Sequence, residues 1–415
     1  MKRFWIFAAA LPLSILAAQT PSESDLLQSA DEVLADVVRI RQLQSKSPIA
    51  KGLKSRVEIE VYLRERLRKD YPAEEVLAEQ KLLIKLGLIP DDTNLGELLV
   101  SLFTEQIAGL YDFESGTFFI ANWIPLETQK PVMAHELTHA LQDQHFDLSS
   151  LLQSEADNDD AMLARAALVE GEGFSVMLQY ILDSMGTSFL DIPDIVKLSR
   201  TSLAATAEQY QVLAHAPEYL RESLLFSYIY GARFVQAYLR RNSWKELSNL
   251  YADLPGSTEQ ILHPEKYLDD RDSPVTVESS EVPLQLEGSW KQIFQNVFGE
   301  FSLHLLLKQF IDVPTAEQAS AGWDGDSVQL YESTAGQLTL IVLSVWDSKK
   351  DAGEFFDAYQ KIIEKKYPSA RPLPPTERPN SSVTVLAWET DQDWIQLQWD
   401  GTRVEVIEKE GSSEQ

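Results

Sequence analysis

Two histidines and a glutamate at positions 135–139 have residue types and a spacing that could bind and use a metal ion. The segment reads H-E-x-x-H, and residues 132–141 contain no glycine or proline, which predicts a helix. On a helix, residues four apart lie on one face, so His135 and His139 point the same way. Two neutral imidazoles at that separation can bind one Zn²⁺ at about 2.0–2.1 Å per bond. Glu136 lies one residue further round and can take a proton from a water at the metal.

A catalytic zinc site needs a third protein ligand and one open position. His145 is one option, because H-E-x-x-H-x5-H is the spacing of the metzincins, in which a glycine three residues after the second histidine turns the chain. Here Gln142 stands at that position, and the helix can continue through it. A helical His145 lies about 600° round from His139 and points away from the metal. We therefore keep His145 as the second choice.

Glu170 is the preferred third ligand. A carboxylate from a second helix packed against the first would complete a set of two histidines and one glutamate. Gly171 and Gly173 would let the two helices approach closely. Each glycine costs a helix about 0.8–1.0 kcal/mol, so two in one turn call for a structural reason. Glu172 lies about 200° from Glu170, so only one of the two can face the metal; the alternative is that both are solvated.

This pattern resembles the gluzincins, the zinc peptidases that combine H-E-x-x-H with a downstream glutamate. Over roughly residues 95–270 the chain is also similar to a group of bacterial secreted metallopeptidase-like proteins. The motifs that carry this similarity are residues 135–148, Glu170-Gly171 and residues 257–267. The resemblance implies one Zn²⁺ per chain and four site residues: the ligands His135, His139 and Glu170, and the general base Glu136.

One position departs from the thermolysin-like pattern. Those enzymes often have an aspartate four residues after the ligand glutamate, where it supports a ligand histidine, but Phe174 stands there in this chain. The support must come from another residue, and Asp143 and Glu172 are the candidates.

A hydrogen-bond donor for the transition state is also expected, because such stabilisation is usually a large catalytic term. His263 is the preferred donor, since it stands in a dense polar run and is fixed by Pro264. Tyr228, Tyr230 and Tyr267 are the other candidates. The alternative for His263 is a loop residue without a catalytic role.

Composition limits the compartment and the partners. The chain has no cysteine, which excludes disulfides, a thiolate nucleophile and cysteine metal ligands. Its formal net charge of −28 opposes binding to nucleic acid. Lys2 and Arg3 before an apolar run predict a signal peptide over residues 1–18. We therefore expect a secreted or periplasmic protein with no membrane anchor once the signal is removed.

The sequence patterns around these residues predict both helices and strands, and so an α+β chain. Helical spacing dominates residues 19–94, and residues 108–120 predict a β-hairpin just before the motif helix. The edge of that hairpin could bind an extended peptide or simply pack within a sheet. A mainly helical, zincin-like catalytic domain is expected over residues 95–272.

A polar run at residues 269–274 predicts a domain boundary, followed by a small α+β domain over residues 273–415. We expect this domain to begin with a helix from Trp290 to Phe310. Alternating β-type runs after it predict strands, with one amphipathic helix from Ala352 to Tyr367.

Together these features predict a zinc-dependent endopeptidase that hydrolyses peptide bonds through a metal-activated water, with Glu136 as general base and a peptide or protein as substrate. One alternative is a non-catalytic secreted binding module stabilised by zinc, in which His145 adds a fourth ligand. Another is an aminopeptidase, in which Glu259 or Asp112 would hold the free amine of the substrate. Nothing in the sequence sets the oligomeric state.

Overall fold

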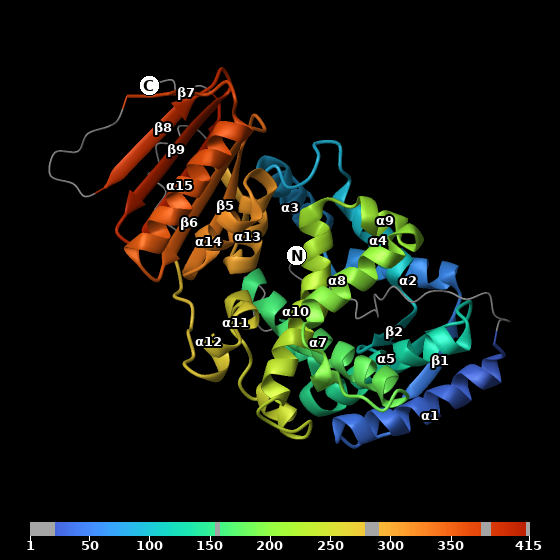
Figure 1. Ribbon diagram of the computed structural model, residues 1–415. Helices are drawn as coiled ribbons and strands as arrows, with labels where there is room; N and C mark the ends of the chain where they lie inside the picture. The colour runs from blue at the N-terminus through green and yellow to red at the C-terminus, as the bar shows by residue number, and fades with distance from the viewer. Residues whose placement is uncertain (1–20, 154–157, 279–289, 375–382, 412–415) are drawn as a thin grey trace.

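The fold is α+β, as predicted, with a helical part up to residue 278 and a sheet-rich part from residue 290 (Figure 1). The structure is a computed structural model that describes residues 21–153, 158–278, 290–374 and 383–411. The signal peptide expected over residues 1–18 lies outside these ranges. Within them, every helix is too short or too polar to cross a membrane.

The N-terminal region is helical, as its spacing indicates. Helix α1 begins with a capping box, in which Ser22 Oγ accepts from Asp25 N and the Asp25 carboxylate accepts from Ser22 N. It ends at Arg41, earlier than the sequence suggests, because Gln42 turns into the left-handed region with φ 56°. The helices of this region are α1 (Glu23–Arg41), α2 (Arg56–Asp70), α3 (Ala73–Lys85) and α4 (Leu95–Gln106).

A small sheet lies beside the motif helix. The predicted hairpin is confirmed: β2 (Gly109–Asp112) pairs antiparallel with β3 (Thr117–Ala121). A strand that the sequence did not reveal, β1 (Ala50–Lys54), pairs parallel with β3. Among the described strands the order is β1-β3-β2, which leaves β2 at an edge, where α5 (Leu126–Phe146) packs against it.

Helix α7 (Asp159–Asp183) is the centre of the helical part. It packs against α5 and, over the largest contact between two elements of the described chain, against α10 (Glu218–Leu239). The crossing of α7 and α10 is close enough to require glycine on both helices. A Cβ atom on Gly171 would lie 2.2 Å from the Gly231 carbonyl carbon, and one on Gly231 would lie 2.0 Å from the Ala167 oxygen.

We expect Gly231→Ala to lower the free energy of unfolding by about 3 kcal/mol, the upper end of the usual cost of over-packing. The new methyl group would meet backbone atoms, which cannot move without separating the helices. Urea denaturation measures the change. Gly96→Ala is the matched control, because its Cβ would meet its nearest neighbours at 3.7 Å, and alanine should there stabilise the helix by up to about 1 kcal/mol. Equal stabilisation of both variants would show that the crossing is not tight.

Shorter elements connect these helices and carry the chain to the second part. They are α6 (Leu148–Gln153), η1 (Phe189–Asp191), α8 (Ile195–Thr206), η2 (Ala207–Gln209), α9 (Gln211–His215), η3 (Glu246–Tyr251), α11 (Thr258–Leu262) and α12 (Glu265–Leu268).

The second part is an antiparallel sheet with helices packed on one face (Figure 1). Its described strands number seven, in the order β4-β5-β6-β10-β9-β8-β7. The strands are β4 (Trp290–Asn296), β5 (Trp323–Ser333), β6 (Leu338–Trp346), β7 (Arg371–Pro372), β8 (Thr384–Glu389), β9 (Asp393–Asp400) and β10 (Arg403–Glu410). The helices are α13 (Gly299–Phe310), α14 (Val313–Ser320) and α15 (Lys349–Lys366).

The prediction of a helix from Trp290 to Phe310 is wrong over its first third. Residues 290–296 form β4, which pairs with β5, and the helix begins only at Gly299. The Asp326 carboxylate on β5 accepts hydrogen bonds from the backbone amides of Phe298 and Gly299, at 2.9 and 2.8 Å. The boundary between β4 and the helix is decided by β5, which pairs with β4 and carries Asp326. These partners lie 27 or more residues away, so local spacing could not place the boundary.

The two parts pack together through charged contacts and apolar side chains. Lys81 on α3 pairs with Glu332 on β5 at 2.6 Å, and the nearly buried Lys85 contacts Asp393 at 3.1 Å. The largest cluster of buried apolar residues includes members from both parts. The domain boundary at residue 272 therefore stays a prediction.

Candidate metal centre

The structure brings His135, His139 and Glu170 together in the interior, between α5 and α7. The two Nε2 atoms lie 2.9 Å apart, and Glu170 Oε2 lies 3.0 Å from His135 Nε2 and 3.4 Å from His139 Nε2. All three side chains are at most 3 % exposed. Two residues one helical turn apart and one from the next helix thus aim their polar atoms at a common point.

The spacing of these atoms fits one small cation. Ligands bound at about 2.0–2.1 Å in a tetrahedron lie about 3.3 Å from one another. The three separations of 2.9–3.4 Å are close to that value. The donor set also fits zinc, which prefers imidazole nitrogen and carboxylate oxygen when no thiolate is present.

Gly173 makes room for the two rings. A Cβ atom there would lie 3.0 Å from His135 Cε1 and 3.1 Å from His139 Cε1, tighter than ordinary contact. The two glycines beside Glu170 therefore have different partners: Gly173 faces the imidazoles of α5, and Gly171 faces α10. Both permit the close approach that the sequence suggested, but only Gly173 serves the metal-binding group directly.

The electrostatic environment favours a neutral His135 and an ionised Glu170, the states that a metal requires, and it favours a proton on His139 that a bound metal would displace. Burial, the largest influence, lowers the pKa of His135, which keeps this ring neutral. Burial alone would raise the pKa of Glu170, but the neighbouring His139 and His135 lower it below its ordinary value. Burial would likewise lower the pKa of His139, and the Glu170 charge raises it instead. An ionised carboxylate thus faces two imidazoles.

Gln142 fixes which nitrogen of His139 carries the proton. Its Oε1 lies 2.7 Å from His139 Nδ1, while its Nε2 donates to Val169 O at 3.1 Å and to the Tyr251 hydroxyl at 2.8 Å. Because the amide nitrogen is used by two acceptors, the oxygen faces the imidazole, and Nδ1 must be the donor. In the neutral ring that a metal requires, Nε2 then keeps its lone pair and directs it toward Glu170 and His135.

Glu136 lies on the side of α5 that faces the small sheet. It is fully buried, and its Oε2 accepts a hydrogen bond from the backbone amide of Tyr111 on β2 at 2.7 Å. Tyr111 is itself held by its hydroxyl, which donates to Asp143 Oδ2 at 2.9 Å. The edge strand thus positions the expected general base. Peptide binding along β2 stays a prediction, and Tyr111 N–H already has Glu136 as its acceptor.

The structure does not bring His263 to this group. Its Nε2 lies 3.0 Å from Glu300 Oε1 on α13, a contact that raises its pKa, and its side chain is 38 % exposed. A catalytic role for His263 stays a prediction without support from the geometry. Tyr228 is the expected donor that lies at the site: its ring stacks on His135 with centroids 5.9 Å apart.

His145 also lies apart from the three ligand atoms. It continues α5, as its spacing predicts, and its Nε2 contacts the backbone oxygen of Gln44 at 2.8 Å. Of the candidates for supporting a ligand histidine, Asp143 binds Tyr111 instead, and Glu172 reaches His139 only through other side chains. Gln142 contacts His139 directly. The sequence contained a signal for it, since residues three apart on a helix are neighbours.

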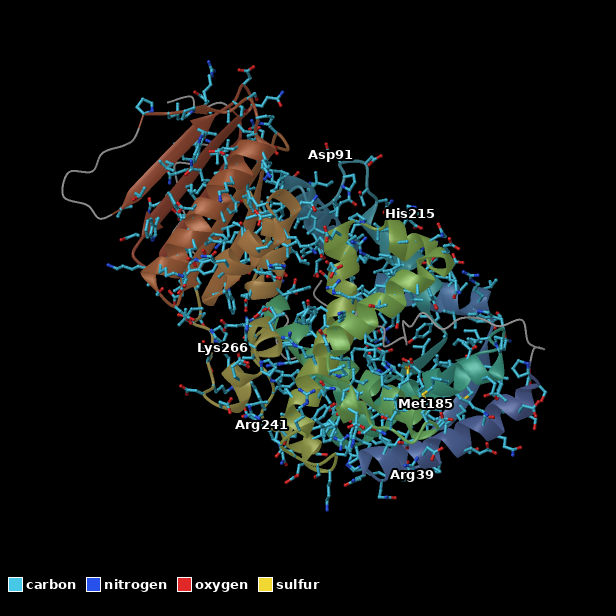
Figure 2. The ribbon with its side chains drawn as sticks, in the orientation of Figure 1. Arg39, Asp91, Met185, His215, Arg241 and Lys266 are labelled. Atoms are coloured by element: carbon cyan, nitrogen blue, oxygen red, sulfur yellow. The ribbon has the colours of Figure 1, made fainter. Side chains whose placement is uncertain are left out.

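A second carboxylate group in the described chain has a lysine at its centre. Glu259, Asp272 and Asp347 place oxygen atoms close enough for one cation. The ammonium group of Lys266 on α12 (Figure 2) lies 2.5, 2.8 and 3.2 Å from these three residues. The ammonium group already occupies the place that a metal ion would take, so we interpret the cluster as a structural ion-pair network.

An apolar cavity of about 80 Å³ adjoins the metal-binding group. Glu170 and Tyr228 are part of its wall, together with apolar side chains from α3, α4, α7 and α10 and from the segment just before α13. Leu83, Leu99, Phe103 and Phe298 are among them. The cavity therefore places apolar surface next to the Glu170 carboxylate, and apolar walls with a few polar groups are common in ligand sites.

Comparison with known proteins concerns the other part of the chain. Residues 288–414, which contain the antiparallel sheet, match the family described as a domain of unknown function (DUF8575). The match begins two residues before β4 and leaves the metal-binding group outside it. Neither the curated proteins nor the solved structures contain a match to the chain.

Proposed function

We propose that the protein is a zinc-dependent peptidase, with His135, His139 and Glu170 as metal ligands and Glu136 as general base. One arrangement carries the proposal: three buried ligand atoms lie 2.9–3.4 Å apart, and the H-E-x-x-H glutamate follows the first of them. Two neutral imidazoles and one carboxylate would leave a bound Zn²⁺ with a net positive charge and an open position, the pattern of catalytic rather than structural zinc sites.

When bound, zinc would polarise the substrate carbonyl and lower the pKa of water to about 7. The protein supplies the proton transfers. Glu136 takes a proton from the attacking water at its carboxylate and passes it to the nitrogen of the leaving amine. The Tyr111 amide, 2.7 Å from Oε2, fixes the orientation of that carboxylate, and Tyr228 borders the site beside His135.

The two alternative functions have less support. A structural zinc site closes with four protein ligands, and within the described residues the group holds three, with His145 bound to Gln44. An aminopeptidase needs a carboxylate for the substrate amine. Glu259 pairs with Lys266, and Asp112 accepts from Ser115 Oγ at 2.6 Å.

The test is zinc-dependent cleavage of an unstructured protein. The zinc-loaded protein is expected to cut casein at internal bonds, to lose this activity with 1,10-phenanthroline, and to regain it with one equivalent of Zn²⁺. Fragments are read by mass spectrometry, beside short peptides with acetylated and free N-termini. Internal cleavage of both peptides identifies an endopeptidase. Intact casein after prolonged incubation with the zinc-loaded protein, or cleavage that continues without metal, would contradict the proposal.

A further inference from the structure

We propose that helix α1 belongs to the metal centre. A buried chain of hydrogen bonds leads from Arg41, the last residue of α1, to His139, and we infer that it sets the affinity for zinc by fixing the orientation of this ligand. The inference rests on the proposed function, because it concerns the same ligand. It also gives the N-terminal helical region a role that the sequence did not reveal.

The chain runs through three side chains that come from three separate elements. His139 Nδ1 donates to Gln142 Oε1 at 2.7 Å, and Gln142 Nε2 donates to the Tyr251 oxygen at 2.8 Å. The Tyr251 hydroxyl donates to Glu172 Oε2 at 2.7 Å. Glu172 Oε1 then accepts from Arg41 Nε. The first three bonds point the same way, from the imidazole toward the Glu172 carboxylate, and the Arg41 guanidinium donates to this carboxylate from the other side.

This direction follows from the chemistry of the Arg41 end. Arginine can only donate, so Glu172 accepts on both of its oxygens. Burial, followed by the Glu172 charge, raises the pKa of Tyr251 well above its ordinary value, so the phenol stays protonated. Its single O–H donates a hydrogen bond to Glu172. The lone pair of Tyr251 then accepts from the Gln142 amide, which leaves Gln142 Oε1 facing the imidazole. Hydrogen bonds aligned in this way strengthen one another.

The chain is largely buried and firmly anchored, and Tyr251 is its one partly exposed member. His139, Gln142, Glu172 and Arg41 are all fully buried. Arg41 has two further acceptors, the Trp244 backbone oxygen and Ser248 Oγ, the latter at 3.1 Å. Burying a guanidinium and a carboxylate costs desolvation free energy, and apolar side chains often stabilise a buried contact equally well. Holding α1 in place therefore does not by itself explain this ion pair. Orientation of a metal ligand is a role that apolar side chains cannot fill.

The test is the zinc dissociation constant of Tyr251→Phe, measured by competition with a chromophoric chelator. The variant removes one oxygen and keeps the ring, which stacks on Phe146 with centroids 3.9 Å apart. We expect zinc to bind about 10-fold more weakly, the lower end of the effect of losing a residue that supports a metal ligand. Gln142→Met, which removes the bond to His139 itself, should weaken binding further, by up to about 100-fold.

Tyr359→Phe is the matched control, because the Tyr359 hydroxyl also donates to a buried carboxylate, Glu408, at 3.0 Å. That pair lies in the sheet-rich part, so the variant should cost stability and leave zinc affinity unchanged. Unchanged affinity in both Tyr251→Phe and Gln142→Met would overturn the inference while the proposed function stands. Failure of the wild-type protein to bind zinc would instead overturn the proposed function.

Discussion

Glu136→Gln is expected to bind zinc as tightly as the wild-type protein and to hydrolyse peptides about 10²–10⁴-fold more slowly, the usual loss when a general base is removed. The amide has nearly the shape of the carboxylate, and its oxygen can still accept from Tyr111 N. It cannot take a proton from water at neutral pH. Initial cleavage rates of casein, beside zinc content, separate loss of the proton acceptor from loss of the metal.

The matched control is Glu127→Gln on the same helix. This side chain is 87 % exposed and contacts only the nearby Lys130 among the described salt bridges, at 3.2 Å. Its replacement should change neither zinc content nor rate, because exposed ion pairs contribute little. Activity close to wild type in Glu136→Gln would assign the proton transfer to another residue and would remove the mechanistic reason for the H-E-x-x-H spacing.

Glu170→Ala is expected to weaken zinc binding by more than the roughly 100-fold that marks the loss of a supporting residue. The change removes one of three ligands and the only carboxylate within the group. It also leaves His135 and His139 without the oxygen that lies 3.0 and 3.4 Å from their Nε2 atoms. Peptidase activity at limiting zinc should fall with the occupancy, and excess zinc should restore part of it.

His145→Ala is the companion variant to Glu170→Ala, because the sequence offered His145 as the alternative third ligand. Since its Nε2 contacts the Gln44 backbone oxygen, its removal should leave zinc affinity within about twofold of wild type. The opposite pattern, with zinc lost in His145→Ala and kept in Glu170→Ala, would place the third ligand at the metzincin position and would require α5 to end earlier than Phe146.

Local patterns in the sequence predicted most elements and the core of the site. The H-E-x-x-H spacing on a helix was enough to place two imidazoles on one face, and the glycines around Glu170 indicated a close helix contact. The start of α2 at Arg56 follows from a capping box between residues three apart, in which Ser55 Oγ accepts from Glu58 N. In each case the determining residues lie within a few positions of one another, where helix geometry fixes their relation.

The rest depended on partners distant in the sequence. The chain from His139 to Arg41 contains bonds between residues up to 131 positions apart, as between Arg41 and Glu172, and no local pattern connects them. Strand β1 was missed because its partner β3 begins at Thr117. His263 looked catalytic in a dense polar run, but the partner that explains it is Glu300, on a helix of the second part.

Elemental analysis of the purified protein tests the central claim most directly. The sample is dialysed against a zinc-containing buffer, then against a metal-free one, and metal is measured against protein concentration. We predict one zinc per chain, retained through the second dialysis and absent from Glu170→Ala treated in the same way. A wild-type protein that holds no zinc after this treatment would contradict the account and leave the convergence of His135, His139 and Glu170 as a metal-free hydrogen-bond cluster.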